Sequence, residues 1–142
     1  MQANFEASNC RMTTDRLKIT SIEVYQLKIR LKEPFIISLG QLTHAENVII
    51  RIRTDLGITG TGECSPFLTI NGESLETAVV VARYLAKALL GRNALDIEGL
   101  SGQMDRVIYG NSSIKSAFDI ALYDIAAQHA GLPLYAFLGG KK

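Results

Sequence analysis

The chain has 142 residues, 47% hydrophobic and 20% charged, which is ordinary for one soluble globular domain with a core of its own. A formal net charge of +1, with no basic run interleaved with aromatic residues, argues against nucleic acid as a partner. The apolar runs are too short to span a bilayer and no basic segment leads into an apolar one at the N-terminus, so we expect no membrane span and a cytoplasmic location.

The patterned part of the chain follows a polar stretch. Residues 1–16 lack periodicity and predict a flexible tail, so the expected domain spans residues 17–140. Residues 17–31 are typical of a strand, but their apolar positions change parity between Val24 and Tyr25. Because a slip of one residue reverses the buried face, we expect a bulge or a strong twist at this point.

A second segment with apolar content follows this strand. We expect Lys32-Glu33-Pro34 to end the strand and residues 35–47 to form a loop, which begins with apolar side chains and continues with a polar run that contains His44. Residues 48–53 then alternate between an apolar set and a partly charged set, which predicts a half-buried strand.

The turn and the return strand that follow contain three glycines. Residues 54–57 predict a short hairpin turn in which Gly57 takes a positive φ. Gly60 and Gly62 have no side chain to pack, so we expect another element to lie close against the return strand, or a bulge within it. Residues 64–72 form a loop with three large apolar side chains, and an apolar loop needs a partner to cover it.

From Ser74 onward the apolar period changes from two residues to three or four. Residues 75–89 predict a helix with one apolar stripe that ends at Gly91. Glu73 and Glu76 are expected near the positive N-terminal end of this helix.

Two further helices and a final turn are expected. Asp96 can cap a short helix that depends on packing for its stability. A longer helix begins at Asn111 or Ser112 and ends at Gly131, and one last turn follows near residues 134–138. Strands followed by helices, without alternation, predict an α+β fold: a three-stranded antiparallel meander followed by a bundle of about three helices.

The chain shows no self-contained active site. Asp119 and Asp124 are five positions apart on the third helix and do not share a face that would bind a metal, whereas Lys115 is spaced to pair with Asp119. Neither the histidines nor Glu63 have partners at the spacing that a catalytic set requires, so we expect no catalytic or metal-binding residue here. Two cysteines without a partnering motif predict reduced thiols: Cys10 and Cys64.

Four stretches nevertheless carry a family likeness: Pro34-Phe35, the GTGE that ends the return strand, the Ser65-Pro66 loop that closes on Asn71-Gly72-Glu73, and SAFDIALYDIAAQHAGLPLYAFLGG. Together they resemble the N-terminal capping domain of the enolase superfamily, in its mandelate racemase and muconate lactonizing branch. The likeness is greatest to dipeptide epimerases, such as those acting on L-Ala-D/L-Glu. Muconate cycloisomerases and o-succinylbenzoate synthases share the same scaffold and are the alternatives.

The resemblance implies that this chain covers the mouth of a (β/α)-barrel. In the family the reaction is proton abstraction next to a carboxylate, with lysines of the barrel as acid and base and Mg²⁺ stabilising the enolate. The lysines and the ligands of Mg²⁺ belong to the barrel. A barrel needs about 200 residues or more, and this chain stops where the first barrel strand would begin. We therefore expect a fragment or a shortened gene product that is inactive alone.

The resemblance also implies which residues meet the substrate, a small carboxylate or a dipeptide. Two cap loops, here residues 35–44 and 64–73, would close over it, and these are the segments that composition marks as unusually apolar. Their apolar side chains would exclude water or simply pack against the barrel, while Ser38 or His44 would contact a polar end. The expected substrate-binding residues are Phe35, Ile37, Ser38, His44, Phe67, Leu68 and Ile70.

A stand-alone module is the competing interpretation. Such a module would bind a partner protein through the apolar loops and the LPLYAFLGG segment. Uncovered apolar surface also favours self-association, so we expect a homo-oligomer.

Overall fold

The computed structural model describes residues 16–38 and 40–141. Almost all of the predicted tail, and Cys10 with it, therefore lies outside the described residues. Within the described ranges no helix has both the length and the apolar character needed to cross a membrane.

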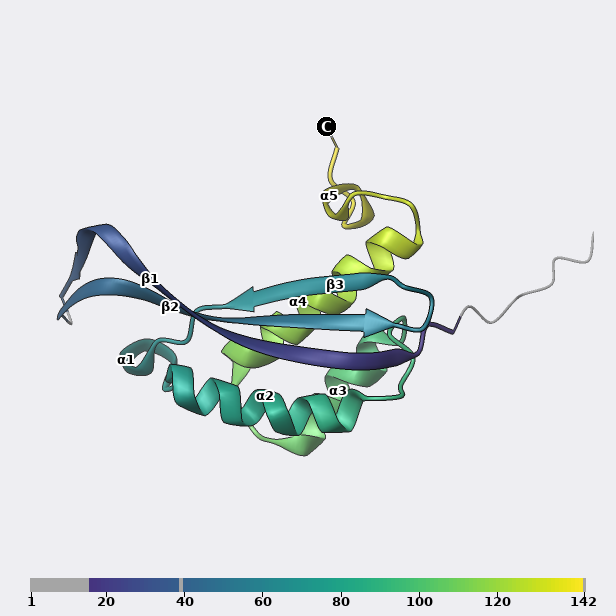
Figure 1. Ribbon diagram of the computed structural model, residues 1–142, viewed down its shortest axis with the longest axis horizontal. Helices are drawn as coiled ribbons and strands as arrows, with labels where there is room; N and C mark the ends of the chain where they lie inside the picture. Colours follow the sequence, from purple (N-terminus) through teal and green to yellow (C-terminus); the bar gives the residue numbers. More distant parts are fainter. Residues whose placement is uncertain (1–15, 39, 142) are drawn as a thin grey trace, which may run out of the picture.

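A three-stranded antiparallel sheet in the order β1-β2-β3 forms one layer, and the longer helices lie on one side of it (Figure 1). The elements are β1 (Ile19–Ile37), β2 (Gly40–Thr54), β3 (Thr59–Cys64), α1 (Leu68–Asn71), α2 (Leu75–Leu89), α3 (Ile97–Val107), α4 (Ser112–His129) and α5 (Leu134–Phe137). The predicted α+β meander followed by three main helices is confirmed. Two single-turn helices, α1 and α5, add to it.

The core lies between the sheet and the helices α2 and α4. Val48, Ile50 and Ile52 alternate along β2 and are fully buried, as the predicted half-buried strand requires. They share one buried cluster with Leu85 of α2 and Phe118 of α4. This arrangement confirms that the apolar stripes read from the sequence face the sheet.

Helix α4 lies unusually close to β3, and two glycines make this possible. A Cβ added to Gly60 would lie 2.1 Å from the carbonyl oxygen of Ala121, and one added to Gly62 would lie 1.9 Å from that of Ala117. Both distances are far below van der Waals contact, so no other residue fits either position without moving the helix. The close approach expected from the sequence is confirmed.

The first hairpin differs from the prediction in two ways. The expected bulge between Val24 and Tyr25 is absent, because these residues pair in step with Ile50 and Ile49. Nor does the strand end at residues 32–34, since β1 continues to Ile37. The register shifts instead between Ile19 and Ser21 and between Arg30 and Phe35. The predicted loop over residues 35–47 is therefore wrong: this segment is the end of one long strand and the start of the next.

The change of parity has a different cause, which is visible in Figure 1. The β1–β2 hairpin extends past the helical layer, so its distal half has no helix against the inner face. Val24 packs towards the core, whereas Tyr25 and Ile29 on the opposite face are 43% and 50% exposed. The apolar positions change face where the cover on the inner face ends.

The helix starts follow the sequence closely. Ser74 and Thr77 form a capping box at the start of α2. The Asp96 carboxylate accepts a hydrogen bond of 3.2 Å from the N–H of Gly99, which confirms the predicted cap of α3. The predicted pair between Lys115 and Asp119 is wrong, because Lys115 Nζ donates instead to Asp105 Oδ1 at 2.8 Å and to the carbonyl of Ile108 at 2.7 Å.

Candidate functional site

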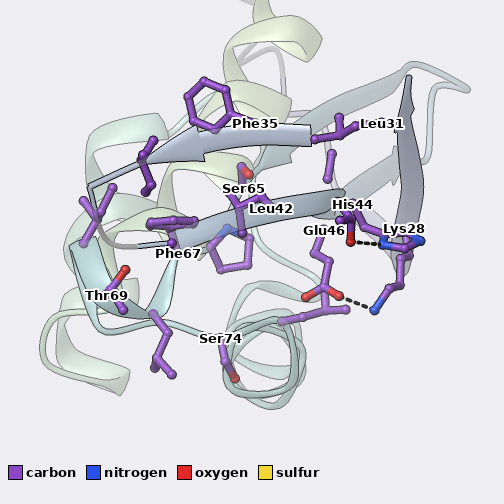
Figure 2. Close-up of a pocket in the computed structure, with 18 of the residues that line it drawn as sticks. Lys28, Leu31, Phe35, Leu42, His44, Glu46, Ser65, Phe67, Thr69 and Ser74 are labelled. Carbon is purple, nitrogen blue, oxygen red and sulfur yellow. Dashed lines mark hydrogen bonds and ion pairs between the residues drawn. The ribbon is translucent and has the colours of Figure 1, made fainter. Parts of the chain in front are cut away.

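An open groove of about 980 Å³ lies where the β1–β2 hairpin faces the loop that follows β3 (Figure 2). One wall comes from the hairpin, the other from residues 65–70, and the start of α2 closes one side. Antiparallel pairing between β1 and β2 continues along the hairpin to Ile37 and Gly40. The loop begins at Ser65-Pro66, immediately after the last residue of β3.

The groove brings together six of the seven residues that the resemblance singled out: Phe35, Ile37, His44, Phe67, Leu68 and Ile70. Three of them are strongly exposed: Phe35 at 58%, Leu68 at 64% and Ile70 at 72%. Ser38 is exposed at the hairpin tip and does not line the groove. Large apolar side chains from two distant segments thus face one open space without covering each other, and their contact with a substrate remains a prediction.

Three further lining residues are absent from the predicted set: one lies in the predicted strand and two lie in the segment predicted as a loop. Leu42, Glu46 and Lys28 line the groove from paired strands. Residues 42–48, LTHAENV, do not alternate between apolar and polar side chains, so no local pattern identifies the start of β2. Lys28 Nζ and Glu46 Oε1 are 2.5 Å apart, so the single lysine of the groove is already paired with a carboxylate.

Two more polar groups lie at the edge of the groove. The Ser74 hydroxyl donates to Glu76 Oε2 at 2.7 Å, and this hydrogen bond lowers the pKa of the Glu76 carboxyl. The Thr43 hydroxyl and His44 Nδ1 are 3.0 Å apart. Apart from the paired Lys28, the described lining residues include neither lysine nor arginine, so the groove presents no unpaired strong cation to a ligand.

The loop that forms the second wall is held at its end by two side chains. Asn71 Oδ1 accepts hydrogen bonds of 3.1 Å from the N–H groups of Phe67 and Glu73. The Glu73 carboxylate, only 4% exposed, accepts from the N–H of Ser113 at 2.8 Å and from that of Ile114 at 3.2 Å. The expectation that Glu73 lies at the start of α2 as a dipole partner is incomplete, because its carboxylate caps α4.

Three further titratable groups, on α4 and at the end of β3, lie outside the groove. Asp124 accepts from the N–H of Thr61 at 2.9 Å and so ties α4 to β3. Burial raises the pKa of the Asp119 carboxyl. Burial also raises the pKa of the Cys64 thiol, which a hydrogen bond with Ser113 partly offsets. Among residues 16–38 and 40–141, no group of three or more histidine, cysteine, aspartate or glutamate side chains is placed to hold a metal ion.

Comparison with known proteins gives the family. The model of the family described as "Mandelate racemase / muconate lactonizing enzyme, N-terminal domain" matches residues 19–139. The chain belongs to this family. This result confirms the resemblance to the capping domain of the enolase superfamily.

The relatives of this N-terminal domain are longer proteins, of which the matched residues make up about a third. The D-Ala-D/L-Ala epimerase of Cytophaga hutchinsonii is 67% identical over 124 residues, which cover 87% of this chain and 34% of that protein. The L-Ala-D/L-Glu epimerase of Bacillus subtilis is 39% identical over 125 residues, with coverage of 87% and 34%. The chain thus spans about a third of the length of the curated relatives it matches.

A solved structure agrees with the sequence relatives. The crystal structure of a dipeptide epimerase from Cytophaga hutchinsonii, complexed with Mg and the dipeptide D-Ala-L-Val, superimposes with a TM-score of 0.87 at 66% identity. The match covers 88% of this chain and 34% of that one. The fold described above is therefore similar to about a third of a protein whose crystal structure holds both Mg and a dipeptide.

Proposed function

We propose that this chain is the substrate-capping domain of a dipeptide epimerase whose catalytic barrel is a separate, C-terminal domain. The observation that carries the proposal is the groove, in which exposed apolar side chains from two distant segments face one open space. Such a surface is unfavourable in water and indicates a partner. Residues 17–140 form the cap in this account. A muconate cycloisomerase or an o-succinylbenzoate synthase is the alternative parent protein.

In this proposal the metal and the acid–base groups belong to the barrel, and the described residues include no group of three or more histidine, cysteine, aspartate or glutamate side chains placed to hold a metal ion. When bound there, Mg²⁺ stabilises the negative charge that develops on a carboxylate next to the abstracted proton. In this proposal the capping domain binds the substrate and encloses it. Phe35, Phe67 and Ile70 exclude water from the substrate, which strengthens the electrostatic interactions inside a closed site.

The charges of the groove favour an apolar dipeptide over an acidic one. Lys28 is paired with Glu46, and Glu76 adds another negative charge at the edge. An acidic side chain enclosed here would lose water without gaining a cation, and such a loss costs about 1 to 3 kcal/mol or more. A substrate with small apolar side chains, such as Ala-Ala, avoids this cost. This preference differs from the L-Ala-D/L-Glu substrate first favoured from the sequence.

The full-length protein tests both statements. With Mg²⁺, we expect it to epimerise Ala-Ala with a kcat/KM about 10- to 100-fold above that for Ala-Glu, because an unpaired carboxylate costs about 1.4 to 2.8 kcal/mol. Exchange of the α-hydrogen in D₂O, followed by NMR, measures the rates. Turnover of neither dipeptide would contradict the epimerase, whereas preference for Ala-Glu would contradict only the apolar assignment.

A pair of variants sharpens the second point. Ile37→Lys places a cation in the groove and should raise kcat/KM for Ala-Glu relative to Ala-Ala. Leu56→Lys adds the same charge at the β2–β3 turn, outside the groove, where Leu56 is 67% exposed. It should leave the ratio unchanged. An equal response to both variants would mean that overall charge, and not the groove, sets the preference.

A further inference from the structure

We propose that Glu73 is a positioning residue, which holds the groove loop of residues 65–72 in place through the first turn of α4. This assignment rests on the proposed function in one respect, since the contact of the loop with a substrate is itself proposed. The anchoring is a property of the described residues and can be tested apart from activity.

Both ends of the groove loop meet at the same turn of α4. The loop starts after Cys64, a buried residue at the end of β3, and the Ser113 side chain lies close enough to lower the pKa of its thiol. It ends before Glu73, whose two carboxylate oxygens accept from the backbone N–H groups of Ser113 and Ile114. Eight residues are thus closed into a compact loop by contacts with two consecutive residues of α4. Between these ends the loop lines the groove with Phe67, Leu68 and Ile70.

The position of Glu73 explains why a carboxylate is needed. Asn111, the residue before α4, has a φ of 54° and provides no side-chain cap, so the first N–H groups of this 18-residue helix would be unsatisfied without Glu73. Glu73 is 4% exposed, and none of the ion pairs among the described residues includes it. Its charge is stabilised by two charge-assisted hydrogen bonds and by the positive end of the helix.

A glutamine at position 73 would keep the size of the side chain but could not accept both hydrogen bonds. One end of its amide is a donor and would face an N–H group, so one of the two bonds is lost and the other no longer involves a charge. The groove loop would then be held by Asn71 from within but released from α4. Its exposed apolar side chains would move as a unit, and the wall of the groove would lose its fixed position.

The test compares Glu73→Gln with Glu98→Gln in the full-length protein. Glu98 is an exposed carboxylate in the first turn of α3, outside the groove. Hydrogen exchange followed by mass spectrometry should show exchange in residues 65–72 and at the start of α4 about 10- to 100-fold faster in Glu73→Gln, with the rest of the domain unchanged. Glu98→Gln should match the wild type. Glu73→Asp keeps the charge at a shorter reach and should give an intermediate rate, which also serves if Glu73→Gln does not fold.

Kinetics provide the second measurement. A displaced groove wall should raise KM for Ala-Ala about tenfold while kcat changes less than about twofold, because binding and not chemistry is affected. Unchanged exchange in the groove loop, or exchange that accelerates equally in all helices, would overturn the assignment of Glu73. An inactive wild-type protein would instead contradict the proposed function, and the exchange measurement would still decide whether Glu73 anchors the loop.

Discussion

Replacing Gly62 with alanine should destabilise the domain by about 3 kcal/mol or more, near the upper end of overpacking effects. The added Cβ would lie 1.9 Å from the carbonyl oxygen of Ala117, a backbone atom of α4 that cannot rotate away. The helix would have to move as a whole. Phe118, fully buried on the same helix, would then lose part of its packing against the sheet.

A second glycine is the control. Gly102 lies within α3, where the nearest atom to an added Cβ is Arg106 Nη1 at 3.8 Å, so Gly102→Ala meets no obstacle. It should stabilise the domain by about 0.5 to 1 kcal/mol through helix propensity. Urea unfolding of the two variants and the wild type measures both effects. Equal midpoints for Gly62→Ala and the wild type would mean that β3 and α4 are farther apart than described here.

Replacing Phe67 with alanine should lower kcat/KM for Ala-Ala in the full-length protein by about 10- to 100-fold, since burying a phenylalanine side chain contributes about 1.5 to 3 kcal/mol. Phe67 lines the groove from the anchored loop and is half-buried even without a substrate. Leu56→Ala removes an apolar side chain of the β2–β3 turn, outside the groove, and should leave the kinetics unchanged. Unaltered kcat/KM in Phe67→Ala would exclude this side chain from the substrate site.

The parts of the fold that follow from local rules could be predicted from the sequence. The period of apolar residues located α2 and α4, and Asp96 marked the start of α3. Gly60 and Gly62 predicted a close neighbour, although only the structure identifies it as α4. In each case the signal lies within a few residues of the feature that it predicts.

The predicted bulge in the hairpin is wrong because the surroundings of the strand, and not a slip in its pairing, set the pattern of apolar residues. A change of parity after Val24 usually indicates a bulge. At Val24 and Tyr25 the strands stay in register. What changes is the helical layer over the inner face of the sheet, because the helices end and the hairpin continues. Lys32-Glu33-Pro34 predict the end of the strand, yet β1 continues through a register shift between Arg30 and Phe35, as proline allows at a bulge or an edge.

The sequence predicted which types of residue line the candidate site, but not the ion pair and hydrogen bonds that hold them in place. The apolar content of residues 35–37 and 67–70 drew attention to both walls of the groove. The pairing of Lys28 with Glu46, which gives the one lysine among the described lining residues a carboxylate partner, depends on strand register. The link from Glu73 to Ser113 joins positions 40 residues apart and leaves no local pattern.

The central claim is that the groove is a lid over a substrate that another domain holds. A crystal structure of the full-length protein with Mg²⁺ and an apolar dipeptide tests it most directly. We expect Phe35 or Phe67 within about 4 Å of a dipeptide side chain, the usual limit for an apolar contact, and the metal on the other domain. A groove filled by side chains of the protein itself, with the dipeptide bound elsewhere, would contradict the claim.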